Sequence, residues 1–238
     1  MSRSNSTELQ SPAKKQFEWN GDKGGFKTYN RETKENEKVP LPFRFLVLDK
    51  LSTIKGYSDH HKAAFWANEV RSTKKDILSV YSKGGLQAEG FYKDIIGTMT
   101  GAKYCQVVYI AFYEGKEMSI GKINLVGTAL SAWIDFCKAE NPEKGAIEVA
   151  EMVEGKKGKT VYQTPVFKKI TVSEEADKIA LGLDVELQAY LAKYLSSHND
   201  QKEPVEAEAQ KSNATVEDYK NLGSKNEVAP ESTDDLPF

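Results

Sequence analysis

Aromatic residues in the first half of this chain repeatedly have lysine or arginine near them in the sequence. Phe65-Trp66 lies between Lys62 and Arg71, and Tyr81 is close to Lys83. Cations can follow a line of phosphates and exposed rings can stack on bases, so this combination is typical of surfaces that bind single-stranded nucleic acid without base preference. The residues predicted to form such a surface are Arg44, Lys55, Lys62, Trp66, Arg71, Lys74, Lys75, Tyr81, Lys83, Tyr92, Lys103 and Tyr104.

The alternative for each ring is a place in the hydrophobic core. Neighbouring residues of a strand face opposite ways, so Phe65 and Trp66 cannot both be buried and one of the two must face outward. Core packing is favoured for Phe43, Phe45, Tyr109 and Phe112, whereas both places stay open for Trp66, Tyr81 and Tyr104.

The segment Gly155-Lys156-Lys157-Gly158-Lys159-Thr160 resembles the end of a phosphate-binding loop, but its spacing is wrong. Such a loop needs a glycine where Val153 stands, and a helix must follow it, whereas a strand pattern follows here. The segment is predicted to be the basic tip of a hairpin. Contact with a DNA backbone and a plain solvated turn are both open for it.

The sequence holds no pattern typical of catalysis or of metal binding. The adjacent His60 and His61 would point apart in a strand, and no zinc-ligand spacing or nucleophile motif accompanies them. Cys105 and Cys137 have no paired spacing and are predicted to be reduced and structural. We therefore expect a binding protein without a cofactor, and not an enzyme.

The two ends of the chain differ from its body in composition and charge. Residues 199–238 hold ten acidic and four basic residues, whereas residues 1–198 hold 29 basic and 25 acidic ones. From about residue 196 onward few large apolar side chains occur, so this segment cannot bury enough surface to order itself. Residues 1 to about 16 are also small and polar, without the apolar stretch of a secretory signal.

The acidic segment ends in Asp234-Asp235-Leu236-Pro237-Phe238, which resembles the C-terminal peptide of the single-stranded DNA-binding (SSB) proteins. Pro237 stiffens the backbone, Phe238 can fill an apolar pocket and the terminal carboxylate can pair with a cation. The resemblance implies that these five residues dock replication, recombination or repair enzymes. Lys23-Gly24-Gly25-Phe26 followed by Pro40-Leu41-Pro42-Phe43 resembles the phage-encoded type, with its extended oligonucleotide-binding (OB) domain.

Strand patterns dominate the body, and glycine-containing turns separate them. Strands are predicted at residues 26–30, 42–51, 64–71, 77–82, 104–113 and 118–125, the last two as a hairpin through Glu114-Gly115-Lys116. Helices are predicted at residues 86–99, 126–139 and 173–195, and a second hairpin at residues 147–153 and 160–171.

These elements favour a mainly β protein with helices (α+β), as an elaborated OB-fold barrel with disordered termini. An unrelated α+β sheet is the alternative. The predicted organisation is a disordered arm at residues 1–16, a DNA-binding domain at residues 17–195 and an acidic tail with its partner-binding peptide at residues 196–238. No apolar run is long enough to cross a membrane. The missing secretory signal and the resemblance to SSB proteins together imply the cytoplasm of a bacterium or a phage-infected host.

Three functions follow from these expectations. The first is a protein that coats single-stranded DNA and recruits enzymes through its tail. The second is an adaptor whose body binds protein and whose tail imitates an SSB tail. The third is a nuclease or another DNA-processing enzyme, which would turn over DNA with magnesium.

Overall fold

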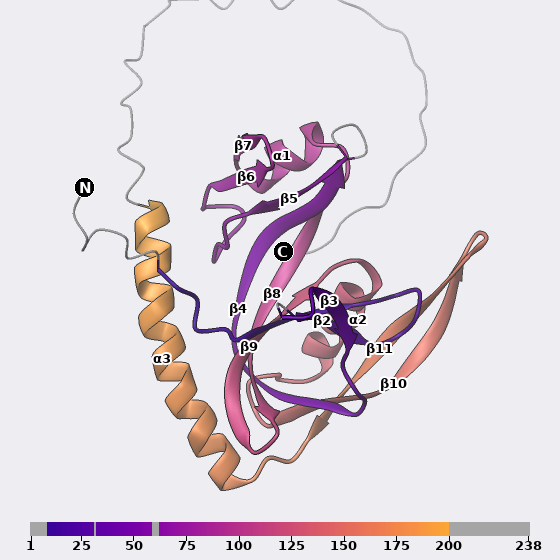
Figure 1. Cartoon of the computed structure of the whole chain (residues 1–238), viewed down its shortest axis with the longest axis vertical. Helices are drawn as coiled ribbons and strands as arrows, with labels where there is room; N and C mark the ends of the chain where they lie inside the picture. Colours follow the sequence, from indigo (N-terminus) through magenta and orange to yellow (C-terminus); the bar gives the residue numbers. More distant parts are fainter. Residues whose placement is uncertain (1–8, 31, 59–61, 200–238) are drawn as a thin grey trace, which may run out of the picture. The chain divides into compact units, whose positions relative to one another are not determined.

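A computed structural model describes residues 9–30, 32–58 and 62–199 of the chain (Figure 1). Within them lie an 11-stranded mixed sheet and three helices. The strands are β1 (Lys15–Trp19), β2 (Phe26–Asn30), β3 (Glu35–Lys38), β4 (Phe43–Ser58), β5 (Ala63–Ala67), β6 (Leu78–Ser82), β7 (Gly85–Gly90), β8 (Ala102–Glu114), β9 (Glu117–Leu125), β10 (Ala146–Lys157) and β11 (Thr160–Ile170). The helices are α1 (Tyr92–Thr98), α2 (Gly127–Ala139) and α3 (Glu174–Asn199).

The sheet is open, with strand order β3-β2-β1-β9-β8-β4-β5-β6-β7, and β10 joins β4 on the side away from β8. β1 runs parallel to β9, while the other strand pairs are antiparallel. The prediction of a mainly β fold with helices is therefore confirmed. Closure of an OB barrel stays a prediction.

The long strand β4 organises the sheet, because it pairs with three other strands. β8 follows one edge of β4 from Phe45 to Gly56, while β10 and β5 pair with opposite ends of its other edge. A bulge between Val47 and Asp49 shifts the register of β4 against β8, and such bulges bend a strand. β4 therefore bends and pairs with β10 at one end and with β5 at the other.

Alternation along the strands builds separate hydrophobic clusters on the two faces. One face packs Phe17, Phe45 and Phe112 against Trp133 of α2. The other face, over Leu51 and Tyr109, is covered by Leu187 and Leu191 of α3. A third cluster, with Ile54, Phe65, Leu78, Val80 and Ile95, lies between β4, β5, β6 and α1.

α3 begins and packs as its sequence predicts. The hydroxyl of Ser173 accepts a hydrogen bond from the backbone N–H of Ala176 at 3.2 Å, and acidic residues fill the first turn. Its Tyr194 hydroxyl accepts a hydrogen bond from the backbone N–H of Glu69 at 2.9 Å. The helix continues to Asn199 and not only to residue 195, where the sequence predicted its end.

The helix predicted at residues 86–99 is wrong over its first half. Residues 85–90 form strand β7, which pairs with β6, and only Tyr92–Thr98 is helical. Gly90 has φ +154°, a conformation that favours glycine and separates the two elements. Pairing with β6 therefore overrides the helical spacing of Leu86 and Phe91.

Two other strands, β1 and β3, were not predicted. Lys15 and Gln16, which the sequence placed in the N-terminal arm, begin β1, and the backbone N–H of Lys14 donates to Ile120 O at 2.8 Å. β3 (Glu35–Lys38) is fully exposed and has no apolar residue to signal a strand. Residues 1–8 of the predicted arm and 200–238 of the predicted tail lie outside the described residues.

Candidate nucleic-acid interface

Four of the predicted binding residues form a row across adjacent strands of the sheet. Lys103 of β8 pairs with Lys55 of β4, Lys55 with Trp66 of β5, and Trp66 with Tyr81 of β6. Residues directly opposite each other on paired strands have side chains on the same face. We call these four residues the Trp66 row.

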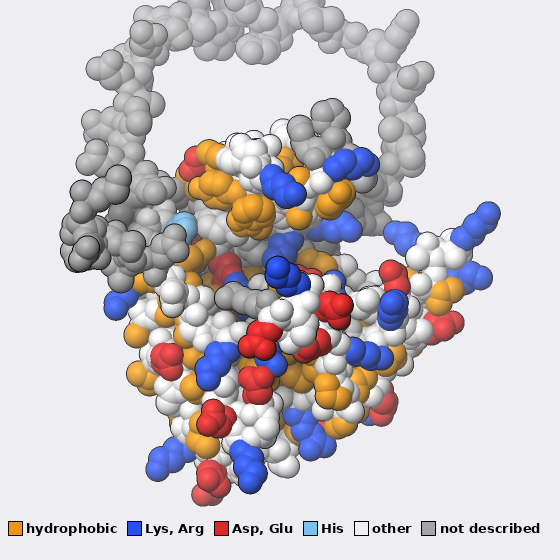
Figure 2. All heavy atoms as spheres, in the orientation of Figure 1, with side chains coloured by type: hydrophobic (Ala, Val, Ile, Leu, Met, Phe, Trp, Pro, Cys, Tyr) orange, Lys and Arg blue, Asp and Glu red, His pale blue; other side chains and the backbone are white. Residues whose placement is uncertain are grey.

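Both rings of the Trp66 row are open to solvent. The side chain of Trp66 is 50% exposed and that of Tyr81 is 40% exposed, whereas Phe65 is 3% exposed and packs in the cluster under β5 and β6. The prediction that one of Phe65 and Trp66 faces outward is confirmed, and the outward residue is Trp66. Figure 2 shows hydrophobic side chains over the part of the protein formed by β5, β6 and β7, with Lys and Arg side chains around them.

The two lysines of the row have different surroundings. Lys55 is partly buried, and its Nζ lies 3.5 Å from Glu18 Oε1, while Glu18 Oε2 lies 3.5 Å from Lys27 Nζ. Burial opposes ionisation of Glu18, but the charges and hydrogen bonds of Lys55 and Lys27 hold its pKa below its ordinary value. Lys103 is exposed and forms no ion pair with any described residue, so its charge is available to an anion.

Tyr92 and Tyr104 belong to the opposite face and do not join the Trp66 row. Tyr104 pairs with Ile54, its hydroxyl lies 2.9 Å from Ser52 Oγ, and its ring meets that of Tyr92 edge-on at 5.7 Å. Burial raises the pKa of both phenols. The structure therefore does not bring these two tyrosines together with Trp66, because Tyr104 follows Lys103 directly and alternation turns it to the α1 side.

Besides Lys55, the two predicted arginines have carboxylate partners. Arg71 donates from both terminal nitrogens to Asp49, the second hydrogen bond at 2.7 Å, and Asp49 also accepts from Gln188 Nε2 of α3 at 2.9 Å. Arg44 Nε lies 2.5 Å from Glu148 Oε2. These contacts join β4 to the 71–77 connection, to α3 and to β10, so the charges of both arginines are already paired with carboxylates.

The remaining cations lie in exposed connections. Lys62 precedes β5, Lys83 occupies the turn between β6 and β7, and Lys74 and Lys75 lie in the connection from Val70 to β6. Lys83 follows Tyr81 by two residues, so its exposed side chain borders the Trp66 row. Lys83 and Lys103 therefore add exposed charges beside the Trp66 row, in which Lys55 is the direct neighbour of Trp66.

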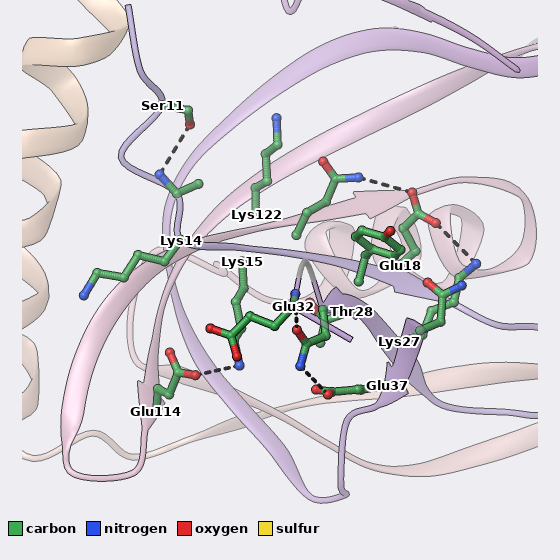
Figure 3. A pocket seen from close by; sticks show the side chains of 15 residues that line it. Ser11, Lys14, Lys15, Glu18, Lys27, Thr28, Glu32, Glu37, Glu114 and Lys122 are labelled. Atoms are coloured by element: carbon green, nitrogen blue, oxygen red, sulfur yellow. Dashed lines mark hydrogen bonds and ion pairs between the residues drawn. The ribbon is translucent and has the colours of Figure 1, made fainter. Parts of the chain in front are cut away.

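A hollow beside the Trp66 row was not predicted from the sequence. It measures about 700 Å³ and is formed by β1, β2 and neighbouring segments, with Glu18, Lys27 and Lys122 among its lining residues. Tyr29, 56% exposed, also lines it. Figure 3 shows Lys15 turned toward Glu114 and Lys27 toward Glu18 around this hollow. We call it the Tyr29 hollow.

The strand pattern at residues 26–30 contained the signal for Tyr29. Phe26 and Thr28 are buried, so alternation turns Lys27 and Tyr29 to the opposite, outer face. The lining combines four lysines (Lys14, Lys15, Lys27 and Lys122) with four glutamates (Glu18, Glu32, Glu37 and Glu114). The hollow is thus balanced in charge and suits a polar ring more than a chain of phosphates.

Comparisons with protein-family models, with curated proteins and with solved structures find no match for this chain. Among the described residues no three His, Cys, Asp or Glu side chains lie together as a metal would require. In the same part of the chain, no helix combines the length and the apolar character needed to traverse a bilayer.

The two cysteines are poor nucleophiles in this fold. Burial raises the pKa of Cys105 to about 12, and burial also raises the pKa of the half-buried Cys137. Because the thiolate is the reactive form, neither thiol is activated at neutral pH. His60 and His61 lie outside the described residues.

Proposed function

We propose that the body of this chain binds single-stranded DNA across the outer face of its sheet. The observation that carries the proposal is the Trp66 row, in which two exposed rings are aligned with Lys55 and with the exposed Lys103 beyond it. Stacking on each ring contributes about 1–3 kcal/mol per base and tolerates any sequence. Lys103 and Lys83 supply the phosphate contacts that such stacking needs.

We also propose that the sheet is an elaborated OB barrel. Gln163 N donates to Gly21 O at 2.7 Å and Trp19 Nε1 donates to Gln163 O at 2.8 Å, so β11 is linked to the β1–β2 turn. Through these bonds, β1, β9, β8, β4, β10 and β11 surround the cluster around Trp133. Such an arrangement supports a barrel whose outer face is covered in part by α3 and leaves the rings of the Trp66 row exposed.

The C-terminal peptide Asp234-Asp235-Leu236-Pro237-Phe238 lies outside the described residues, and its proposed role rests on sequence alone. We propose that it recruits replication, recombination or repair enzymes to the coated strand. Phe238→Ala should abolish capture of such enzymes from a host extract and leave DNA affinity unchanged. Val228→Ala, in the same tail, is the control, and equal capture by both variants would refute the recruiting role.

Binding to oligo(dT) tests the main proposal. Trp133 is fully buried and Trp19 is partly buried in the same cluster, so quenching of tryptophan fluorescence should come mainly from Trp66. We expect stoichiometric quenching at low salt and an affinity that falls steeply as salt rises. Absence of binding at low salt, or tighter binding to duplex than to oligo(dT), would overturn coating of single strands.

An adaptor that binds protein is the second candidate, and the charge balance of the Tyr29 hollow favours it. A hollow with equal numbers of lysines and glutamates attracts a polyanion weakly. If the adaptor function is correct, the body binds no oligonucleotide at low salt while the C-terminal peptide still captures its enzymes.

A further inference from the structure

The hairpin of β10 and β11 continues beyond the sheet as a two-stranded ribbon. β10 pairs with β4 only at residues 147–149, whereas from Glu151 to Lys157 the backbone pairs with β11 alone. Figure 1 shows this ribbon, residues 151–166, projecting away from the strands around β4. A two-stranded ribbon of this kind is marginally stable by itself and needs support at its base.

Contacts with the β1–β2 turn supply that support. Besides the two hydrogen bonds that join Gln163 to Trp19 and Gly21, Gly24 allows a close approach, because a side chain there would collide with Met152. Further out, the ring of Tyr162 lies against Gly155, where a Cβ would overlap it. These contacts hold the ribbon in place, so the tip lies at the end of a supported hairpin.

The tip has a different chemistry from the Trp66 row. Lys156, Lys157 and Lys159 are exposed and form no ion pair with described residues, while Glu151 is engaged with Lys168 at 2.6 Å. Tyr162 is half-buried against Gly155, so among the described residues the exposed rings lie elsewhere. The tip thus offers charge for phosphates without a platform on which a base could stack.

Cations without stacking rings suit a nucleic acid whose bases are already stacked on one another. A two-stranded ribbon also has the width that the major groove of duplex DNA admits. Figure 2 shows Lys or Arg side chains at the end of the projecting ribbon. We propose that the β10–β11 ribbon binds duplex DNA next to the single strand held by the Trp66 row, so that the protein favours junctions between the two.

This inference rests on the proposed binding of single strands, and one set of titrations separates the two. The substrates are oligo(dT), a blunt duplex, and a junction that joins this duplex to an oligo(dT) overhang. The variant is Lys156→Ala/Lys157→Ala/Lys159→Ala. Its control, Lys116→Ala/Lys178→Ala/Lys193→Ala, removes the same charge from exposed positions in the β8–β9 turn and α3.

We expect the intact protein to bind the junction about tenfold more tightly than oligo(dT), through added phosphate contacts. The tip variant should lose this tenfold preference for the junction. On the junction, the magnitude of its slope of log affinity against log salt should decrease by about 2–3. Its affinity for oligo(dT) should match that of the control variant. All six lysines are exposed, so the midpoint temperature of thermal unfolding should be unchanged in both variants.

Equal affinity of the tip variant and its control for the junction would overturn the duplex proposal. It would also be overturned if the tip variant lost as much affinity for oligo(dT) as for the junction. Tip-dependent binding of the blunt duplex without any binding of oligo(dT) would keep the ribbon proposal and remove the proposed coating function. A second variant, Lys157→Glu, reverses one charge and should weaken junction binding more than Lys157→Ala does.

Discussion

Trp66 and Tyr81 stand directly opposite each other on β5 and β6, and both rings face solvent on the same side of the sheet. Cross-strand aromatic neighbours normally stabilise a sheet by packing together. Here much of each ring stays exposed, at a place flanked by Lys55, Lys83 and Lys103. The pair therefore presents two stacking surfaces at a spacing fixed by the strands.

Trp66→Ala should weaken oligo(dT) binding by about 1–3 kcal/mol, because it removes one stacking platform. The fold should survive, since half of the side chain is exposed. Labelled oligo(dT) and fluorescence anisotropy measure this without relying on tryptophan emission. The neighbouring Phe65→Ala is the control and should cost about 3–5 kcal/mol of folding stability, because it empties a buried site. If Trp66→Ala unfolds the protein instead, Trp66 supports the fold and is not a stacking platform for DNA.

Tyr104→Phe should leave oligo(dT) affinity unchanged, because Tyr104 lies on the α1 side of the sheet. Its hydroxyl contacts Ser52 Oγ, so the variant should lose about 0.5–1.5 kcal/mol of folding stability. Urea unfolding and the anisotropy titration together give both values. Loss of DNA affinity without loss of stability would return Tyr104 to the interface.

Lys103→Ala should decrease the magnitude of the slope of log affinity against log salt by about 1, which is the effect of one lost phosphate contact. Arg71→Ala should act differently, because Arg71 is bound to Asp49 and its removal leaves a partly buried carboxylate without its main partner. Titrations at several salt concentrations, paired with thermal unfolding, distinguish the two effects. Identical changes in both variants would contradict the assignment of Arg71 to structure.

Folding stability should fall as the solution is acidified below about pH 4, partly through Asp49. Burial opposes ionisation of Asp49, but hydrogen bonds from Arg71, Gln188 and the Lys50 amide, with the charge of Arg71, keep its pKa below the ordinary value. A carboxyl with a lowered pKa in the folded state stabilises the fold above its unfolded pKa, and this stability is lost as pH falls through the folded pKa. Between pH 7 and pH 3, the midpoint temperature of thermal unfolding should therefore fall more for the intact chain than for Asp49→Asn.

The sequence predicted those elements whose signal is local. Apolar runs on both sides of Glu114-Gly115-Lys116 predicted the β8–β9 hairpin, and Gly115 has φ +65° in its turn. β3 has no apolar residue, so its pairing with β2 had no signal in composition. In β7, pairing with β6 overrode a helical spacing that Gly90 already interrupted.

The candidate site was predicted in part, for a related reason. Trp66 was assigned to the surface correctly, because alternation with Phe65 is a local rule. The same rule, applied to Lys103 and Tyr104, would have separated these neighbours onto two faces. The Tyr29 hollow depends on the parallel pairing of β1 with β9, between residues far apart in the chain, and no local pattern predicts that contact.

The two ends of β4 belong to different hydrophobic clusters, with Phe43 and Phe45 in one and Ile54 in the other. β5 joins the sheet through the distal end of β4, so β5, β6 and β7 can open locally while the cluster around Trp133 stays intact. Trp66 and Tyr81 lie on this part, whereas Tyr29 lies on β2. A DNA strand that touched both places would bind only while both parts are folded, so the bound ligand would couple the local opening of β5, β6 and β7 to the rest of the sheet.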